Sequence, residues 1–159
     1  RDVGAARGQT DGTRPLRRAG GRTEKEGASS FPDFRHFMGE GGPQIDAVGV
    51  LSVVGCRSRH LSLELKRMVI QTKRQGYGRA ALHLAKKLAF DDLGAHRLWL
   101  DVKGRNTGAA ALYRAEGFAQ EGVLREAVKV AQGFDSLVVM SMLRPEFDAR
   151  RAAALELVA

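Results

Sequence analysis

The chain has 159 residues, of which 43% are hydrophobic, and this fits one globular domain with its own core. No apolar run approaches the roughly 20 residues that a transmembrane helix needs, so we expect no membrane partner. A single cysteine, Cys56, excludes an internal disulfide, and no secretion signal is visible in the printed sequence. We therefore expect a cytoplasmic protein.

The positive charge is concentrated in one part of the chain. The formal net charge is +8, and Lys and Arg exceed Asp and Glu by this whole amount between residues 57 and 105. Such a basic field attracts polyanions, either a nucleotide cofactor or nucleic acid. The histidines lack the i, i+4 spacing of a helical metal pair, so we predict no metal site.

The first half of the chain predicts an arm followed by strands. Residues 1–30 are rich in small and charged residues and predict a poorly ordered or loosely docked N-terminal arm. An aromatic cluster follows at 31–38, and the glycines of 39–43 indicate a turn. Strands are expected at 45–54 and 61–70, joined by a hairpin connection at 57–60.

The second half alternates helices with strands. Helices are predicted at 78–93, ended by Gly94, and from Asn106 or Thr107 to Glu116, ended by Gly117. Strands are predicted at 98–102, 118–124 and 136–143, and a helical tail follows Pro145. The order predicts an α/β protein with one mixed sheet. We divide it into the arm (1–30), the main domain (31–147) and the C-terminal helical tail (148–159).

A glycine-rich loop at residues 73–80 is the most informative stretch. Gly76 and Gly78 let the backbone expose successive N–H groups just where a helix begins, and this arrangement predicts a phosphate site. The loop formally fits the dinucleotide fingerprint, with Asp101 as the ribose-binding acid. The polar residues 71–75 argue against that fingerprint, because its first glycine should follow a buried strand directly.

Residues 61–143 resemble the GCN5-related N-acetyltransferase (GNAT) superfamily. The loop from Lys73 to Gly78 fits the family pattern Q/R-x-x-G-x-G/A in all but its first position. The family's second half is matched, in order, by Leu98, Trp99, Leu100, Asp101, Val102, Asn106, Ala111, Leu112, Tyr113, Glu116, Gly117 and Phe118. Residues 121–125 resemble the branch that acetylates N-terminal amines of ribosomal proteins. The resemblance implies a mostly antiparallel sheet, flanked by helices, whose central parallel strand pair is splayed into a V.

This resemblance implies acetyl-CoA as the cofactor, bound in the V. Backbone groups of Met68, Val69 and Ile70 would pair with the pantetheine arm. The pyrophosphate would be held by the loop residues Lys73, Arg74, Gln75, Gly76, Tyr77, Gly78 and Arg79. Asn106 matches the asparagine that bonds the pantetheine, and an N-cap is its alternative role.

Tyr113 matches the tyrosine that protonates the departing CoA thiolate, and a packed aromatic is its alternative role. Glu64 or Asp101 would accept the proton of the incoming amine; a water molecule is the alternative, as is a structural ion pair for either carboxylate. Cys56 could suggest a covalent route, but an isolated cysteine after a valine run is more often core filler.

The resemblance implies an N-acetyltransferase that moves acetyl directly from acetyl-CoA to a primary amine, either a protein N-terminus or a small molecule, and it allows a homodimer. Residues 1–43 do not resemble the first strand and paired helices with which the family usually begins. The alternatives are a nucleic-acid- or ribosome-binding module that uses the basic segment, and a non-catalytic CoA-binding domain.

Overall fold

The computed structural model describes residues 16–17, 23–28, 34–41, 46–71 and 75–157, with side chains for 49–71 and 75–157. The strands are β1 (Leu16–Arg17), β2 (Thr23–Ala28), β3 (Phe34–Gly41), β4 (Asp46–Val54), β5 (Ser62–Ile70), β6 (Arg97–Lys103), β7 (Ala119–Val130) and β8 (Gly133–Leu143). The helices are α1 (Tyr77–Lys87), which continues as the π-helix η1 (Leu88–Asp92), α2 (Thr107–Ala115) and α3 (Arg144–Glu156).

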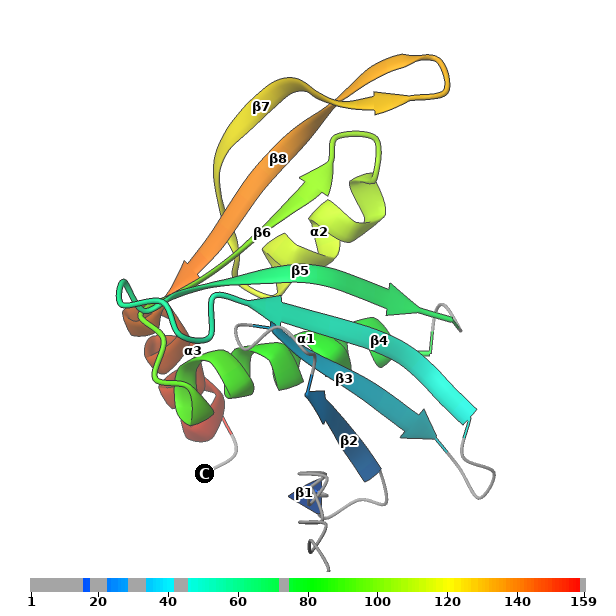
Figure 1. Ribbon diagram of the computed structural model, residues 1–159. Helices are drawn as coiled ribbons and strands as arrows, with labels where there is room; N and C mark the ends of the chain where they lie inside the picture. The colour runs from blue at the N-terminus through cyan, green and yellow to red at the C-terminus, as the bar shows by residue number, and fades with distance from the viewer. Residues whose placement is uncertain (1–15, 18–22, 29–33, 42–45, 72–74, 158–159) are drawn as a thin grey trace, which may run out of the picture.

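One mixed sheet forms the centre of the molecule, in the order β1-β2-β3-β4-β5-β6-β8-β7 (Figure 1). All neighbours pair antiparallel except β5 and β6. That parallel pair has only three partners in register, from Ser62–Arg97 to Glu64–Trp99. Beyond Glu64 the two strands diverge, so the predicted V-shaped opening in a mixed, mostly antiparallel sheet is confirmed.

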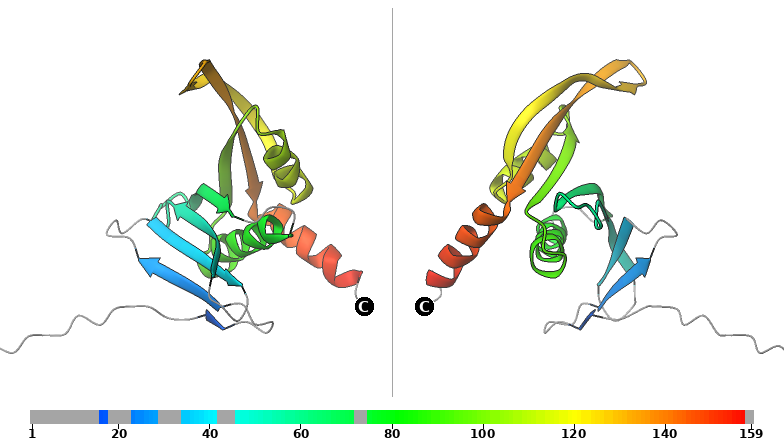
Figure 2. Two further views of the ribbon diagram at one scale, coloured as in Figure 1. Left: turned by 90° about the vertical axis from the view of Figure 1, so that its right-hand side faces the viewer. Right: turned by 60° about the vertical axis from the view of Figure 1, so that its left-hand side comes forward.

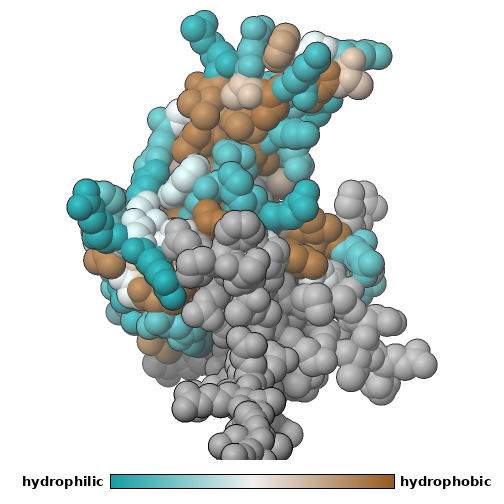
Figure 3. All heavy atoms as spheres, in the orientation of Figure 1, coloured by the Kyte–Doolittle hydropathy of each residue, from teal (hydrophilic) through white to brown (hydrophobic). Residues whose placement is uncertain are grey.

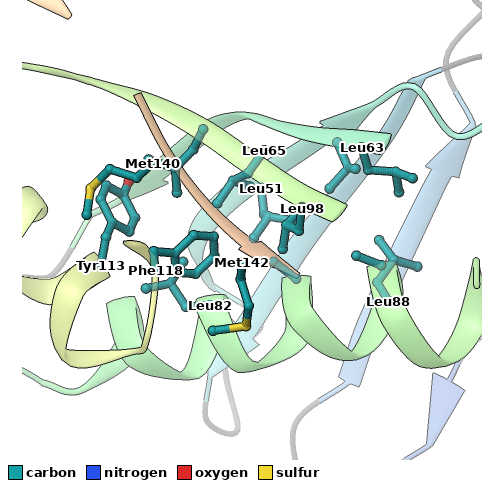
Figure 4. Close-up of a cluster of buried hydrophobic side chains, with 14 of the residues drawn as sticks. Leu51, Leu63, Leu65, Leu82, Leu88, Leu98, Tyr113, Phe118, Met140 and Met142 are labelled. Atoms are coloured by element: carbon teal, nitrogen blue, oxygen red, sulfur yellow. The ribbon is translucent and has the colours of Figure 1, made fainter. Parts of the chain in front are cut away.

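The described helices all lie on one side of the sheet (Figure 2). Alternate residues of the strands face them, because successive side chains of a strand point to opposite faces. Leu65, Leu98 and Met140 on this face pack with Leu82 of α1 and Phe118 in a fully buried core (Figure 4). The other face of the central strands carries Glu64, Trp99 and Asp101, and in the described part of the chain no helix covers it.

Several predicted elements differ from the observed ones. Within the expected arm, β1 and β2 are strands of the sheet, and the remainder of residues 1–30 lies outside the described residues. The turn expected at 39–43 is occupied up to Gly41 by β3, which continues past a register shift at Gly39 and Glu40. Strand pairing there overrides the turn preference of glycine.

At the C-terminal end, β7 and β8 form a longer hairpin than the sequence predicts, because two irregularities let β7 stay paired through Val130. Helix α3 begins at Arg144, directly after β8, so it crosses the boundary that we drew between 147 and 148. None of the helices built from the described residues is both long and apolar enough to span a membrane.

Candidate functional site

The open edge of β5 forms one wall of the V. Through Ile70 the strand is paired with β4 on one side, whereas its pairing with β6 ends at Glu64. The backbone groups of residues 65–70 that point away from β4 thus have no strand partner among the described residues. Met68, Val69 and Ile70, predicted to bind pantetheine, lie on this edge, and Val69 is 48% exposed. An extended ligand could add here as a further strand.

A bulge in β5 begins where the V opens. Val53 is opposite Leu65 and Ser52 is opposite Arg67, so Lys66 is the extra residue of β5. Bulges re-aim side chains and increase the local twist of a strand. This bulge therefore contributes to the divergence of β5 from β6.

The glycine loop ends at the start of α1. Gly76 is the N-cap, with φ 77° and ψ −4°, a left-handed conformation that favours glycine. The first turn of α1 has no side-chain cap and no acidic residue, so its N–H groups can receive an anion. Gln75 and Arg79 are exposed beside it, while Lys73 and Arg74 lie outside the described residues.

Close packing joins this helix start to α2. A Cβ at Gly78 would lie 3.2 Å from Leu112 Cδ2, the residue before Tyr113. Arg79 donates from Nε to Glu116 Oε1 at 2.7 Å, just past the end of α2. The loop and the helix that carries Tyr113 therefore form one packed unit.

Glu116 is the hub of this unit. It is 7% exposed and also contacts His83 Nε2 and Lys86 Nζ, each at 2.8 Å from Oε2. Burial alone would raise the pKa of Glu116, but the ion pairs with Lys86 and His83 outweigh it and leave the pKa below its ordinary value. The sequence resemblance placed Glu116 in a motif without indicating its partners.

Tyr113 is buried beside Met140, and its ring packs edge-on to Phe118 with 6.0 Å between the ring centroids (Figure 4). Burial raises the pKa of its hydroxyl, and the negative charge of Asp101 raises it further. The phenol is thus held protonated and near a carboxylate of β6. This arrangement is compatible with both roles considered for Tyr113, a packed aromatic and a proton donor.

The two candidate bases face the opening from opposite strands. Glu64 lies on β5 and accepts from Lys66 Nζ at 2.9 Å, while Asp101 lies exposed on β6. The pKa of Lys66 is raised, first by its hydrogen bond with Glu64, and Asp101 also contributes. Lys66 is thus in contact with Glu64 and feels the charge of Asp101, which also acts on Tyr113. Lys66 was not predicted, although its i, i+2 spacing from Glu64 was a signal for a charge pair on one strand face.

Asn106 caps α2, since its side chain accepts from the backbone N–H of Ala109 at 3.3 Å. The alternative role as an N-cap is therefore present, and pantetheine binding stays a prediction. Cys56 follows β4 in the turn that leads to β5, at the closed end of the V. Its thiol lies 3.9 Å from the carbonyl oxygen of Val53.

An ion-pair cluster joins β6, β7 and β8 beside the closed end of the V. Arg97 of β6 forms two hydrogen bonds to the carboxylate of Glu121, which also accepts from Ser141 Oγ at 2.7 Å. The hydrogen bond from Arg97, followed by that from Ser141, lowers the pKa of Glu121 to about 2. This cluster joins β6, β8 and β7, and it was also missed in the sequence.

A second hollow lies away from the V. Hydrophobic side chains gather over the β7–β8 hairpin (Figure 3), among them exposed Val123, Leu124 and Phe134. An open groove of about 770 Å³ is lined there by Val123, Leu124, Arg125, Glu126 and Ser136. It contains none of the predicted catalytic or cofactor-binding residues.

The V, the uncapped helix start beside it and the tyrosine helix define an acyltransferase-like class of fold. Residues 45–118 match the Acetyltransferase (GNAT) family. This match, over just under half of the chain, supports the resemblance to the GNAT superfamily that the sequence motifs predicted.

Curated relatives support the predicted branch. The [ribosomal protein bS18]-alanine N-acetyltransferases of Salmonella typhimurium and Escherichia coli K12 are each 35% identical over 71 residues, 44% of this chain. The match covers 47% of those proteins, so the chain spans about half the length of the curated relatives.

Solved structures agree on the fold. A spermidine/spermine N-acetyltransferase from Vibrio cholerae, in complex with manganese ions, superposes with a TM-score of 0.69 at 25% identity, covering 74% of this chain and 69% of that one. The spermidine N-acetyltransferase of the same organism in complex with CoA and spermine gives a TM-score of 0.68 at 25% identity, covering 72% and 68%.

Proposed function

We propose that this protein is an N-acetyltransferase that moves acetyl from acetyl-CoA directly to a primary amine. One observation supports this most: the uncapped start of α1 and the open edge of β5 meet beside a buried tyrosine and two carboxylates. The relatives named above are acetyltransferases that act on a ribosomal protein or on a polyamine.

The residues present fit coenzyme A. The first turn of α1 would hold the pyrophosphate through the backbone amides of Gly78 and Arg79, and the turn itself contains no acidic residue. The edge of β5 at Met68, Val69 and Ile70 would bond the amides of the pantetheine arm. Asn106 would retain its cap on α2 and present its amide NH2 to the same arm. When bound, acetyl-CoA supplies an activated acetyl thioester.

Proton transfer is assigned to three side chains. Tyr113 is protonated at neutral pH and would give its proton to the departing thiolate. Glu64 or Asp101 would accept the proton that the ammonium of the acceptor must lose. The two carboxylates flank the opening from β5 and β6, so either can face an amine there.

The acceptor is a protein N-terminus or a small-molecule amine. In the described part of the chain, no helix covers the face of the sheet that carries Glu64, Trp99 and Asp101. One solved relative is dodecameric. A homodimer of this chain, like its place in the cytoplasm, stays a prediction.

The nucleic-acid alternative loses support from the ion pairs. Basic side chains of residues 57–105 that have acidic partners are Lys66, Arg79, Lys86, Lys87, Arg97 and Arg105. These partners reduce the charge left for phosphate backbones. Binding of RNA or DNA that falls steeply with salt and is not displaced by acetyl-CoA would revive this alternative.

A thiol-release assay tests the proposal. The protein is incubated with acetyl-CoA and a panel of alanine-initiated peptides, polyamines and simple amines, and free CoA is measured. We expect release that depends on at least one amine. Acetyl-CoA binding without release across the panel would instead indicate a non-catalytic CoA-binding domain.

A further inference from the structure

Lys66 places an amine of the protein itself at the opening. It is the extra residue of the β5 bulge, two residues after the last β5–β6 partner, Glu64. Its side chain is 55% exposed, so the long aliphatic chain can move while its ammonium remains near the V. Lys87, at the end of α1, has no such position.

The ammonium of Lys66 occupies the place expected for an acceptor amine. It lies 2.9 Å from Glu64 Oε1, and the charge of Asp101 on the opposite strand also acts on it. Asp101 acts in turn on the hydroxyl of Tyr113. The amine of Lys66 is thus in contact with one candidate proton acceptor and within the electrostatic influence of the other, which also acts on the candidate proton donor.

We propose that Lys66 is a site of self-acetylation, modified within its own protein molecule. This inference rests on the function proposed above. Glu64 or Asp101 takes a proton from the Lys66 ammonium, and the neutral Nζ attacks the carbonyl carbon of the acetyl thioester. The N–C bond forms, the C–S bond breaks, and the thiolate takes a proton from Tyr113. The second proton, which Nζ loses as the amide forms, restores the Tyr113 phenol, and the carboxylate releases the first proton to solvent. The products are Nε-acetyl-lysine and free CoA.

Acetylation of Lys66 changes the charge of the opening. The amide product has no positive charge, so the ion pair with Glu64 is lost and Glu64 becomes available to an external ammonium. The modified protein therefore has one more uncompensated negative charge beside the V. It should accept cationic amines more readily than the unmodified protein.

Site-resolved mass spectrometry tests this inference. The whole chain is incubated with acetyl-CoA and no added amine, digested, and the acetylated fraction of each lysine is followed in time. Lys87 is the matched control, because it is 43% exposed and paired with Asp92 but lies away from the V. We expect Lys66 to be modified at least several-fold faster than Lys87, at a rate independent of protein concentration.

Two variants identify the chemistry. Tyr113→Phe should slow the modification of Lys66 and leave the slow modification of Lys87 unchanged. Lys66→Arg keeps the positive charge and cannot be acetylated under these conditions, so it should fold, bind acetyl-CoA and release no CoA beyond the background of the other lysines. Equal rates at Lys66 and Lys87, or loss of the difference on dilution, would overturn the inference.

A binding measurement gives a readout that does not depend on transfer. Lysines are dimethylated with isotope-labelled methyl groups, and their NMR signals are followed as CoA is added. We expect the Lys66 signal to shift more than that of Lys87. If amines of the panel are acetylated while Lys66 is neither shifted nor modified, this inference fails alone; if acetyl-CoA does not bind at all, the proposed function fails with it.

Discussion

Tyr113 combines burial with a specific electrostatic neighbour. Its hydroxyl has a raised pKa because the site is buried and Asp101 is close, so the phenol stays protonated well above neutral pH. A proton donor needs this state at the moment when the thiolate departs. Any loss of activity caused by ionisation of Tyr113 should therefore occur only above the ordinary tyrosine pKa of about 10.

We expect Tyr113→Phe to lower turnover by about a hundredfold, the usual contribution of a positioned acid, and to leave acetyl-CoA affinity nearly unchanged. Tyr77→Phe is the control, because Tyr77 is the only tyrosine of the chain besides Tyr113 and lies in the glycine loop. Steady-state thiol release and calorimetry measure the two quantities. Unchanged turnover in Tyr113→Phe would leave Tyr113 with a packing role alone.

Gly76 allows a second test at single-residue scale. Its φ of +77° disfavours any side chain, and Gly94 beyond η1 has a similar φ of +63°; at both positions an added Cβ would meet no atom within 4 Å. Alanine at either position should cost roughly 1 kcal/mol of folding free energy through backbone strain. Only Gly76→Ala should also weaken acetyl-CoA binding, because only this glycine shapes the phosphate loop. Equal affinities in the two variants would contradict the role of the loop.

At the scale of elements, Glu116 connects α1 to the end of α2. We expect Glu116→Gln to reduce the free energy of unfolding by about 3 kcal/mol, since it leaves the buried ammonium of Lys86 without its counter-charge. The double variant Glu116→Gln/Lys86→Met should regain part of the lost free energy of unfolding, because the unpaired ammonium is removed as well. Asp92→Asn, which breaks the exposed pair with Lys87, is the control and should cost under about 1 kcal/mol. Urea unfolding measures all four proteins, and equal losses in the two single acidic variants would contradict the hub role.

The Arg97–Glu121–Ser141 cluster joins three strands and predicts a pH dependence. The folded pKa of Glu121 is about 2 against an ordinary 4.5, so its ionised form stabilises the fold above the ordinary pKa, and this stability is lost as pH falls toward about 2. Because Glu121 is 39% exposed, solvent screening limits the effect to about 1 kcal/mol. We expect Glu121→Gln to be less stable than wild type at neutral pH, with a gap that closes across this window. A gap that stays constant in urea unfolding measured between pH 4.5 and about 2 would contradict the assignment.

The sequence predicted the elements whose signals are local. The α1 and α2 boundaries followed from Gly94, Gly117 and Asn106, and β4 to β6 followed from β-branched and alternating runs. The V itself came from the family resemblance. Polar β2 and glycine-containing β3 were missed because their strand state depends on pairing with neighbours, which composition does not encode.

The candidate site was predictable in its types of residue but not in its contacts. Tyr113, Glu64 and Asp101 were named from motif positions, and the structure brings them to one opening. The bulge that presents Lys66 depends on the register of β4 against β5 and has no sequence signature of its own. The convergence of Arg79, His83 and Lys86 on Glu116 likewise needs the packing of two helices that are distant in sequence.

At the scale of the whole molecule, a single layer of described helices covers one face of the sheet and the V opens between its two halves (Figure 2). The proposed function needs this opening to accept coenzyme A from the side of the glycine loop and an amine from the side of the two carboxylates. The proposed acetylation of an amine and the proposed self-acetylation of Lys66 both require that acetyl-CoA binds in this opening first.

Calorimetric titration of the whole chain with acetyl-CoA tests this step most directly. We predict saturable binding with one site per chain at sub-millimolar concentration, weakened in Gly76→Ala and preserved in Gly94→Ala. Absence of binding at sub-millimolar acetyl-CoA, by a protein shown to be folded, would contradict the account.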